Sequence, residues 1–141
     1  MTNKVRIRAY QKGDALKVAV QKEQENEAKE FGLFFDEICA YSVVDDEEIF
    51  GVFGYVIDEQ NEAVCYALFS PKIRAHLRYL IRFIKKETAF ICAQKKVVKV
   101  MMTVKKNFVK AKKFAHLLGF CYQRDLPKFY ENTDYQLFER M

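Results

Sequence analysis

Four cations recur at helical spacing in the stretch LFSPKIRAHLRYLIRFIKKE, residues 68–87. Arg74, Arg78, Arg82 and Lys85 are separated by four, four and three residues, so a helix here would present them on one face. Guanidinium groups bind phosphate oxygens through paired hydrogen bonds, and the free N–H groups of a first helical turn add further donors. The spacing therefore predicts either an anion site around Arg74 and Arg78 or a basic face exposed to solvent.

The residues ahead of these cations predict where the helix begins. Ser70 can accept a hydrogen bond from a first-turn N–H group, and Pro71 has the backbone angle that a first helical position needs. His76 lies in the same turns, where it either contacts a phosphate or remains an exposed surface residue. An apolar stripe on another side of the helix predicts a core-facing side. It consists of Ile73, Leu77, Leu80, Ile81 and Ile84.

Charge is distributed unevenly along the chain. Residues 1–70 hold 7 Lys+Arg against 14 Asp+Glu, a net of −7, whereas residues 71–113 hold 14 against 1, a net of +13. A basic block of this density repels itself unless anions accompany it, which indicates a polyphosphate ligand or a nucleic acid as partner. The stretch KKNFVKAKKF also interleaves aromatics that could stack on bases, although Phe108 recurs at core spacing with Ala111 and Leu118.

Cysteine and histidine do not form a ligand pattern. The four cysteines contain no C-x-x-C pair, and neither histidine has a Cys or His at ligand spacing, so we expect no metal site. Cys39, Cys65 and Cys121 have apolar neighbours, which favours buried free thiols over disulfides. His116 lies between two apolar residues and is expected to be structural.

Candidates for proton transfer are few. Asp58, Glu59 and Glu62 lie near one strand end, and Tyr66 and Tyr130 carry hydroxyl groups. A general base would need a raised carboxyl pKa beside the reacting group. Turn or surface roles explain each of these residues better, so we predict no catalytic residue from the sequence.

Periodicity predicts the elements that position these groups, in the order β-α-β-β-β-α-β-α-β-β. Residues 4–10 alternate as a half-buried strand does, and a helix is expected from Asp14 as its N-cap, either short or broken before Phe31. Three strands rich in β-branched and aromatic residues follow as a meander, at residues 37–45, 48–58 and 63–70. Gly51 and Gly54 indicate a bulge or a close backbone approach in the second of these.

The second half continues with a strand over residues 96–104 and a helix over residues 107–119. Asn107 is the expected cap of that helix and Gly119 its end. Two last strands, 120–124 and 135–140, are expected to flank a loop over 125–134. A strand-helix-strand unit implies a parallel crossover, and the hairpins need antiparallel neighbours. We therefore expect one α/β (α+β) domain over residues 1–141, with a mixed central sheet flanked by helices.

Length and composition fit a soluble protein. A chain of 141 residues, half of them hydrophobic, can bury a core without disulfides. No apolar run approaches the roughly 20 residues that span a bilayer, and the first residues lack the apolar centre of a secretory signal. We expect a cytoplasmic location and no membrane contact.

The element order and its motifs resemble the Gcn5-related N-acetyltransferase (GNAT) family along nearly the whole chain. In that family the fourth strand leads into V-x-P-x-x-R-G-x-G-x-G/A, and Phe69, Pro71, Arg74 and Ala75 fall on the first four landmarks. Ala111 also precedes Gly119-Phe120 by eight residues, as in the family, and NTDYQLFERM resembles the closing strand. The resemblance implies an acyl-CoA N-acyltransferase fold and transfer of an acetyl group from acetyl-coenzyme A to a primary amine.

The resemblance also implies which residues would hold acetyl-coenzyme A. The backbone of the strand end would pair with the pantetheine arm like an added strand, and the following helix would hold the pyrophosphate. The implied binding residues are Leu68, Phe69, Arg74, Ala75, His76, Leu77, Arg78, Tyr79, Asn107 and Ala111.

Four positions depart from the family pattern. Leu77 and Tyr79 occupy the two glycine positions, which normally let backbone N–H groups approach the pyrophosphate. Ala115 stands where many members have a tyrosine as general acid, and Asn107 lies one residue early. In these departures the chain resembles altered bacteriophage forms of the fold, including internal virion proteins.

Two functions follow as hypotheses. The first is an acetyltransferase with an altered pyrophosphate loop, acting on a small-molecule or protein amine. The second is a non-catalytic domain, virion-associated if phage-encoded, that uses residues 71–113 on nucleic acid or a protein partner. The oligomeric state does not follow from the sequence.

Overall fold

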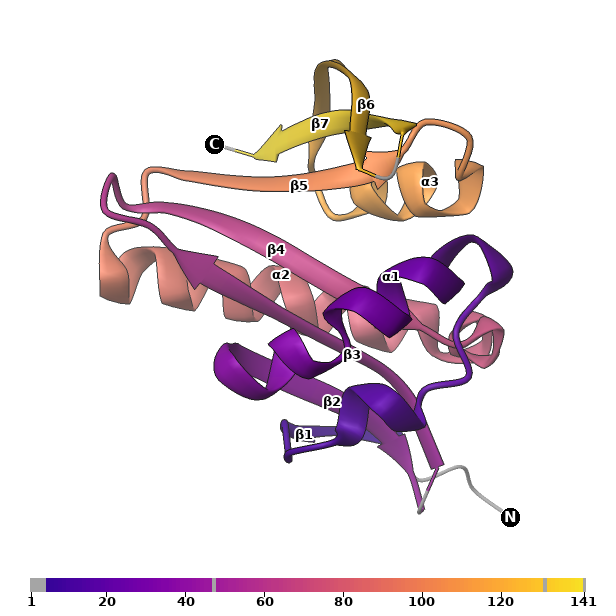
Figure 1. Cartoon of the computed structure of the whole chain (residues 1–141). Coiled ribbons are helices and arrows are strands. Elements are labelled where there is room, and N and C mark those ends of the chain that lie inside the picture. The colour runs from indigo at the N-terminus through magenta and orange to yellow at the C-terminus, as the bar shows by residue number, and fades with distance from the viewer. Residues whose placement is uncertain (1–4, 47, 131, 141) are drawn as a thin grey trace. The chain divides into compact units, whose positions relative to one another are not determined.

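The computed structural model describes residues 5–46, 48–130 and 132–140. Their strands form a seven-stranded mixed sheet of order β1-β2-β3-β4-β5-β7-β6 (Figure 1). The strands are β1 (Val5–Ala9), β2 (Cys39–Asp45), β3 (Glu48–Ile57), β4 (Glu62–Phe69), β5 (Lys99–Lys105), β6 (Cys121–Tyr130) and β7 (Thr133–Arg140). The α-helices are α1 (Glu25–Phe31), α2 (Leu77–Lys95) and α3 (Val109–Leu117). Short 3-10 helices are η1 (Asp14–Lys17), η2 (Lys22–Gln24), η3 (Leu33–Glu37) and η4 (Pro71–His76).

The described residues fall into two compact units. The first comprises those of 1–56 and 65–77, and the second those of 57–64 and 78–141. No helix among the described residues is long and apolar enough to cross a membrane.

In the first unit, β2 pairs antiparallel with both β1 and β3, as the alternating and β-branched segments predict. Its core combines residues of η1, η3, β2, β3 and β4: Ala15, Val18, Phe35, Ala40, Val44, Ile49, Val52 and Leu68. Gly51 and Gly54 both mark close approaches, which confirms the expectation drawn from them. A Cβ at Gly51 would lie 2.8 Å from Cε1 of Phe69, and a Cβ at Gly54 would lie 2.6 Å from the carbonyl oxygen of Cys39.

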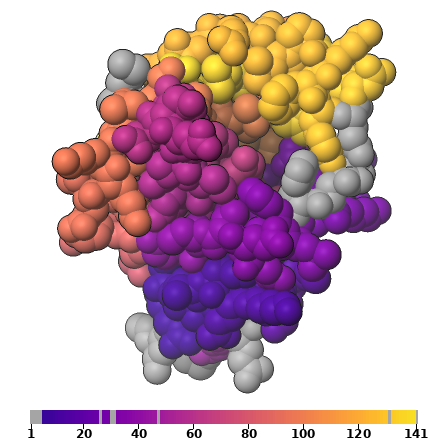
Figure 2. Space-filling view, turned by 60° about the vertical axis from the view of Figure 1, so that its left-hand side comes forward, coloured from indigo at the N-terminus to yellow at the C-terminus, as the bar shows by residue number. Residues whose placement is uncertain are grey.

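In the second unit, the start of β4 pairs with β5 in parallel, which confirms the predicted crossover. The turn before β4 is also tied to the chain after α2, because Asn61 accepts the backbone N–H of Val98 at 2.9 Å. Figure 2 looks onto this end of the unit, where that turn (magenta) and the end of α2 (orange) reach the surface. β7 lies between β5 and β6 and pairs antiparallel with both. Of the predicted apolar stripe of α3, Phe108, Ala115 and Leu118 are buried and Ala111 is half-buried.

One expected boundary is confirmed and one was wrong. The helix expected after β1 is short and broken before Phe31, as predicted: Gly13, at φ +88, precedes η1, Val18 is extended, and the α-helix begins only at Glu25. Few apolar residues follow Val18, so no continuous core-facing stripe holds a longer helix together. The expected loop over 125–134 belongs largely to β6 and β7, whose pairing continues from Leu126 opposite Tyr135 to Tyr130 opposite Thr133.

Three local expectations were also wrong. Asp14 is not an N-cap, since Gly13 holds that position and the Asp14 carboxylate has other partners. Asn107 is not the cap of α3 either: Phe108 is the N-cap residue, and Asn107 only accepts the N–H of Val109 through its backbone oxygen. The cysteines are free, but none is buried: Cys39 and Cys121 are exposed, and Cys65 and Cys92 are half-buried. Cys39 and Cys121 each open a strand, where apolar neighbours in sequence do not ensure burial.

Candidate functional site

At the end of β4, one row of backbone groups points away from β3. Ser70 donates its N–H to the carbonyl oxygen of Phe50 in β3 at 2.7 Å. Because successive residues of a strand point their backbone groups to opposite sides, the N–H and C=O of Phe69 and the C=O of Ala67 point away from β3. The pairing of β4 with β5 covers only Glu62 to Val64, before these groups. This is the edge on which the resemblance places the pantetheine arm.

The side chain of Gln24 occupies that edge. Its Nε2 donates to the carbonyl oxygen of Ala67 at 3.0 Å, and its Oε1 accepts the N–H of Phe69 at 3.1 Å. The carbonyl oxygen of Phe69 in turn accepts the backbone N–H of Gln21 at 3.3 Å. Gln24 is 8% exposed, so its amide acts as a buried, strand-like partner of β4. Leu68 and Phe69 are buried in the same strand end.

The segment after β4 begins as predicted but winds differently. Ser70 is the N-cap, its Oγ accepting the N–H of Lys72 at 3.2 Å, and Pro71 occupies the first turn. The turns that follow are 3-10 rather than α-helical. Residues three apart lie on the same side of a 3-10 helix. Ile73 and His76 therefore share one side of η4: Ile73 is buried, and the ring of His76 stacks on that of Phe50 with the ring centroids 5.6 Å apart.

This winding closes the backbone anion site that the resemblance implies. Ile73 donates its N–H to the carbonyl oxygen of Ser70 at 3.0 Å, and the following amides of η4 form the i to i+3 bonds that define a 3-10 helix. Lys72 bonds to Ser70 Oγ, and Pro71 has no N–H. At the start of this segment the N–H groups of Lys72 and Ile73 are therefore already used, and Pro71 has none to offer a diphosphate.

The cationic side chains nearby remain available. In the first unit Arg74 and Ala75 are exposed, Leu77 is half-buried, and Lys72 forms an ion pair with Glu48 at 2.9 Å. Arg74 forms no ion pair with any described residue. In this segment, a diphosphate would therefore be bound by the side chain of Arg74 and not by the backbone N–H groups at the start of η4.

In the second unit, the remaining implied residues lie at the start of α2 and in or just before α3. Arg78 is exposed in the first turn of α2 and forms no ion pair with a described residue. Tyr79, at a former glycine position, is 44% exposed and does not fill the core. Asn107 is exposed ahead of α3, and Ala111 is half-buried on it. Ala115 is fully buried, and its methyl side chain offers no hydroxyl group at the position of the family's general acid.

The carboxylates considered for proton transfer have structural partners or lie in solvent. Asp58 accepts the backbone N–H groups of Gln60 and Glu62 at 2.9 and 3.0 Å and so stabilises the β3–β4 turn. Glu62 pairs with Lys99 at 3.7 Å, and Glu59 is exposed.

The two tyrosines considered as acids pack against other rings. Burial raises the pKa of Tyr66, whose ring contacts Phe34 edge-on at 5.1 Å, and the neighbouring Cys65 adds to the rise. Tyr130 meets Tyr135 edge-on at 6.2 Å. These geometries favour packing roles for both residues.

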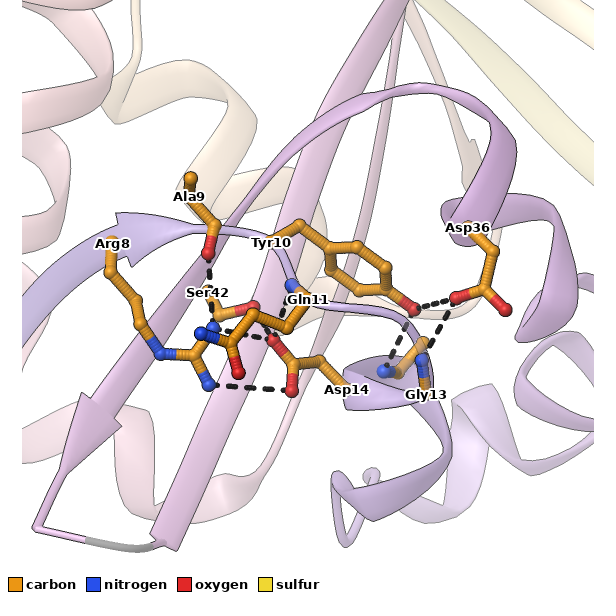
Figure 3. A network of polar contacts seen from close by, with 9 residues as sticks. Arg8, Ala9, Tyr10, Gln11, Gly13, Asp14, Asp36 and Ser42 are labelled. Atoms are coloured by element: carbon orange, nitrogen blue, oxygen red, sulfur yellow. Dashed lines mark hydrogen bonds and ion pairs between the residues drawn. The ribbon is translucent and has the colours of Figure 1, made fainter.

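A polar network in the first unit was not predicted from the sequence (Figure 3). The buried carboxylate of Asp14 accepts hydrogen bonds from Arg8 at 2.7 Å, from Ser42 Oγ at 2.7 Å and from the N–H of Gln11 at 2.9 Å. Burial alone would raise the pKa of Asp14, but these bonds and the charge of Arg8 lower it overall. The network ties β1 and η1 to β2.

A second carboxylate in Figure 3 holds the segment between β1 and η1 in place. Asp36 accepts the N–H of Gly13 at 3.0 Å and the hydroxyl of Tyr10 at 2.7 Å. Burial and the bond to Asp36 raise the pKa of Tyr10 to about 12. Across the described residues, no three His, Cys, Asp or Glu side chains gather as metal ligands would.

No family model and no curated protein sequence matches the chain. Its fold, however, matches solved structures along its length. A GNAT-family acetyltransferase from Bacillus anthracis is 10% identical, with a TM-score of 0.72 over 100% of this chain and 96% of that one. Ribosomal-protein-S5-alanine acetyltransferase from Vibrio fischeri is 13% identical, with a TM-score of 0.72 over 100% and 94%.

A third match is a spermidine N-acetyltransferase chimera of Vibrio cholerae SpeG and hSSAT. It is 15% identical, with a TM-score of 0.71 over 97% of this chain and 95% of that one. At such identities the likeness concerns the path of the backbone. The chain therefore has the fold of the GNAT acetyltransferases.

Proposed function

We propose that the protein transfers an acetyl group from acetyl-coenzyme A to a primary amine. The observation that carries the proposal is the Gln24 amide held between Ala67 and Phe69. It supports the view that this edge of β4 accepts an amide group through one donor and one acceptor, which is what a pantetheine arm presents. Gln24 would be displaced when that arm binds.

The diphosphate is proposed to bind side chains and not a glycine loop. The N–H groups of Lys72 and Ile73 at the start of η4 are already used, whereas Arg74 and Arg78 are exposed and form no ion pair with described residues. A guanidinium group presents paired donors that match phosphate oxygens. Arg74, with Arg78 four residues further along the chain, would take over the role that backbone N–H groups have elsewhere.

The reaction would be a direct displacement. The amine nitrogen forms a bond to the acetyl carbon, the carbon–sulfur bond breaks, coenzyme A leaves as its thiolate, and the amine proton passes to water. Because the Ala115 position offers no acid, we propose that the chain contributes positioning and charge more than proton transfer. The net charge of −7 on residues 1–70 favours a cationic amine as acceptor.

The solved structures suggest which acceptors to try first. Two of the matching proteins are described as acting on spermidine and on an alanine of a ribosomal protein. Both are amines, so spermidine and an alanine-ended peptide form a first panel.

The test measures coenzyme A thiol release with that panel, together with calorimetric titration of acetyl-coenzyme A. The wild type is expected to bind, and a variant with Arg74→Ala and Arg78→Ala is expected to bind at least about tenfold more weakly. A variant with Lys85→Ala and Lys86→Ala removes the same charge from α2 and is expected to bind as the wild type does. Absence of acetyl-coenzyme A binding to the wild type would refute the proposal.

A further inference from the structure

A row of cations follows the exposed side of α2. Arg78, Arg82 and Lys86 recur every fourth residue and end at Phe90, and Lys85 lies beside them. We call this the α2 row. Side chains four apart lie above one another on a helix, about 6 Å apart along its axis. All five residues are exposed, and Glu87, the one acidic residue of α2, is half-buried.

The cations of the row are not neutralised within the protein. Arg78, Arg82, Lys85 and Lys86 form no ion pair or hydrogen bond with a described residue. Three other lysines of the basic block are paired, namely Lys72, Lys99 and Lys106. Four adjacent like charges without counter-ions attract a polyanion.

Two aromatic side chains accompany these cations. Phe90 is 57% exposed at the end of the row, and Tyr79 is 44% exposed beside its start. Neither makes a ring contact or hydrogen bond with any described residue. The aromatics of the other basic stretch behave differently, since Phe108 is buried and Phe114 half-buried. Of these two basic stretches, α2 is therefore the one that presents exposed rings beside unpaired cations.

We propose that the α2 row binds single-stranded nucleic acid, without preference for sequence. The cations would follow the phosphates, and a base would stack on Phe90, since aromatic side chains and a cationic track are the combination that single strands require. A duplex keeps its bases stacked inside and would not use the ring. An anionic membrane would need a continuous apolar stripe, whereas here cations separate the two rings.

The proposal does not depend on acetyl transfer. The residues that test it, Arg82, Lys85, Lys86 and Phe90, are not among those proposed to hold acetyl-coenzyme A. DNA and RNA share the chemistry that the row recognises, so both are tried.

The test is fluorescence anisotropy with labelled 20-nucleotide DNA and RNA single strands of one mixed sequence, over a range of salt. Four phosphate contacts predict a slope of log affinity against log salt of about −3. A triple variant, Arg82→Ala with Lys85→Ala and Lys86→Ala, is expected to lower that slope to about −1 and to bind at least about tenfold more weakly at low salt. Its acetyl-coenzyme A titration should match that of the wild type.

One control variant and one test of the aromatic ring complete the set. Lys17→Ala with Lys22→Ala and Lys29→Ala removes three exposed charges elsewhere and should leave the salt slope unchanged. Phe90→Ala should weaken binding about tenfold, the range expected for one stacked base, without altering the slope.

Three results would overturn the proposal. They are no binding of either strand at low salt, equal losses in the two triple variants, and tighter binding of a duplex or of anionic vesicles than of single strands. Binding of DNA alone or of RNA alone would support it and identify the partner.

Discussion

The side-chain amide of Gln24 accepts the backbone N–H of Phe69 at 3.1 Å across 45 residues of sequence. With the bond from Nε2 to Ala67, it gives the end of β4 a partner that is not a strand. The same backbone groups are those that would receive the pantetheine arm. Binding of acetyl-coenzyme A and the position of Gln24 are therefore coupled in this account.

Replacing Gln24 should reveal that coupling. Gln24→Ala frees two backbone groups of β4 and removes a competitor, and each hydrogen bond contributes about 0.5–1.5 kcal/mol net. We expect acetyl-coenzyme A to bind up to about tenfold more tightly by calorimetry, while the free energy of unfolding falls. Gln21→Ala is the matched control, because Gln21 reaches Phe69 through its backbone alone. Weaker binding by Gln24→Ala would mean that Gln24 supports the site and does not compete for it.

The Asp14 network should make stability depend on pH in a defined direction. Because the pKa of Asp14 is lowered in the folded state, the unfolded chain binds the proton first, and stability falls as pH drops below about 4. Asp14→Asn should reduce the free energy of unfolding by about 2 kcal/mol at pH 7, since it weakens charged hydrogen bonds. Urea denaturation at pH 7 and pH 3 measures this, and the difference from the wild type should shrink at pH 3. A difference that stays constant with pH would show that the charge of Asp14 contributes nothing.

Ser70 should stabilise the turn that follows β4. Its Oγ is the acceptor for Lys72, and the side chain is buried, so Ser70→Ala should lower the free energy of unfolding by about 1 kcal/mol. Ser70→Asp can accept the same bond and should recover part of the loss. Equal losses in both variants would point to packing, and not capping, as the role of Ser70.

Gly51 should be required by the ring of Phe69. Gly51→Ala places a methyl group 2.8 Å from Cε1 of that ring and should cost about 1–3 kcal/mol of stability. In a Phe69→Leu background the same change should cost less, because the obstructing ring is gone. Additive losses in the double-mutant cycle would contradict a direct contact.

The sequence predicted those parts of the fold that depend on local patterns. Ser70 and Pro71 mark the start of the helical segment because capping involves neighbours in the chain. The meander and the parallel crossover follow from alternation and element order. Such signals act within a few residues, and the structure confirms them.

Other features depend on contacts between distant residues and could not be predicted. Gln24 lies in a polar stretch that indicates only a short or broken helix, and its role becomes visible only in its contact with β4. The 3-10 winding of η4 follows from the packing of Ile73 and the stacking of His76 on Phe50, which is 26 residues earlier in the numbering. The neighbours of Asp14 in the sequence predict an N-cap, because its actual partner Ser42 is 28 residues away.

The most direct measurement is a two-dimensional nitrogen–proton NMR titration of the wild type with acetyl-coenzyme A. We expect the backbone amide of Phe69 and the side-chain amide of Gln24 to shift together, saturating at one ligand per chain, because the arm replaces Gln24 on β4. The amide of Ser70, which bonds to Phe50, should shift less. If saturating ligand leaves the Phe69 and Gln24 signals unmoved, the β4 edge does not receive acetyl-coenzyme A and the proposed binding mode is wrong.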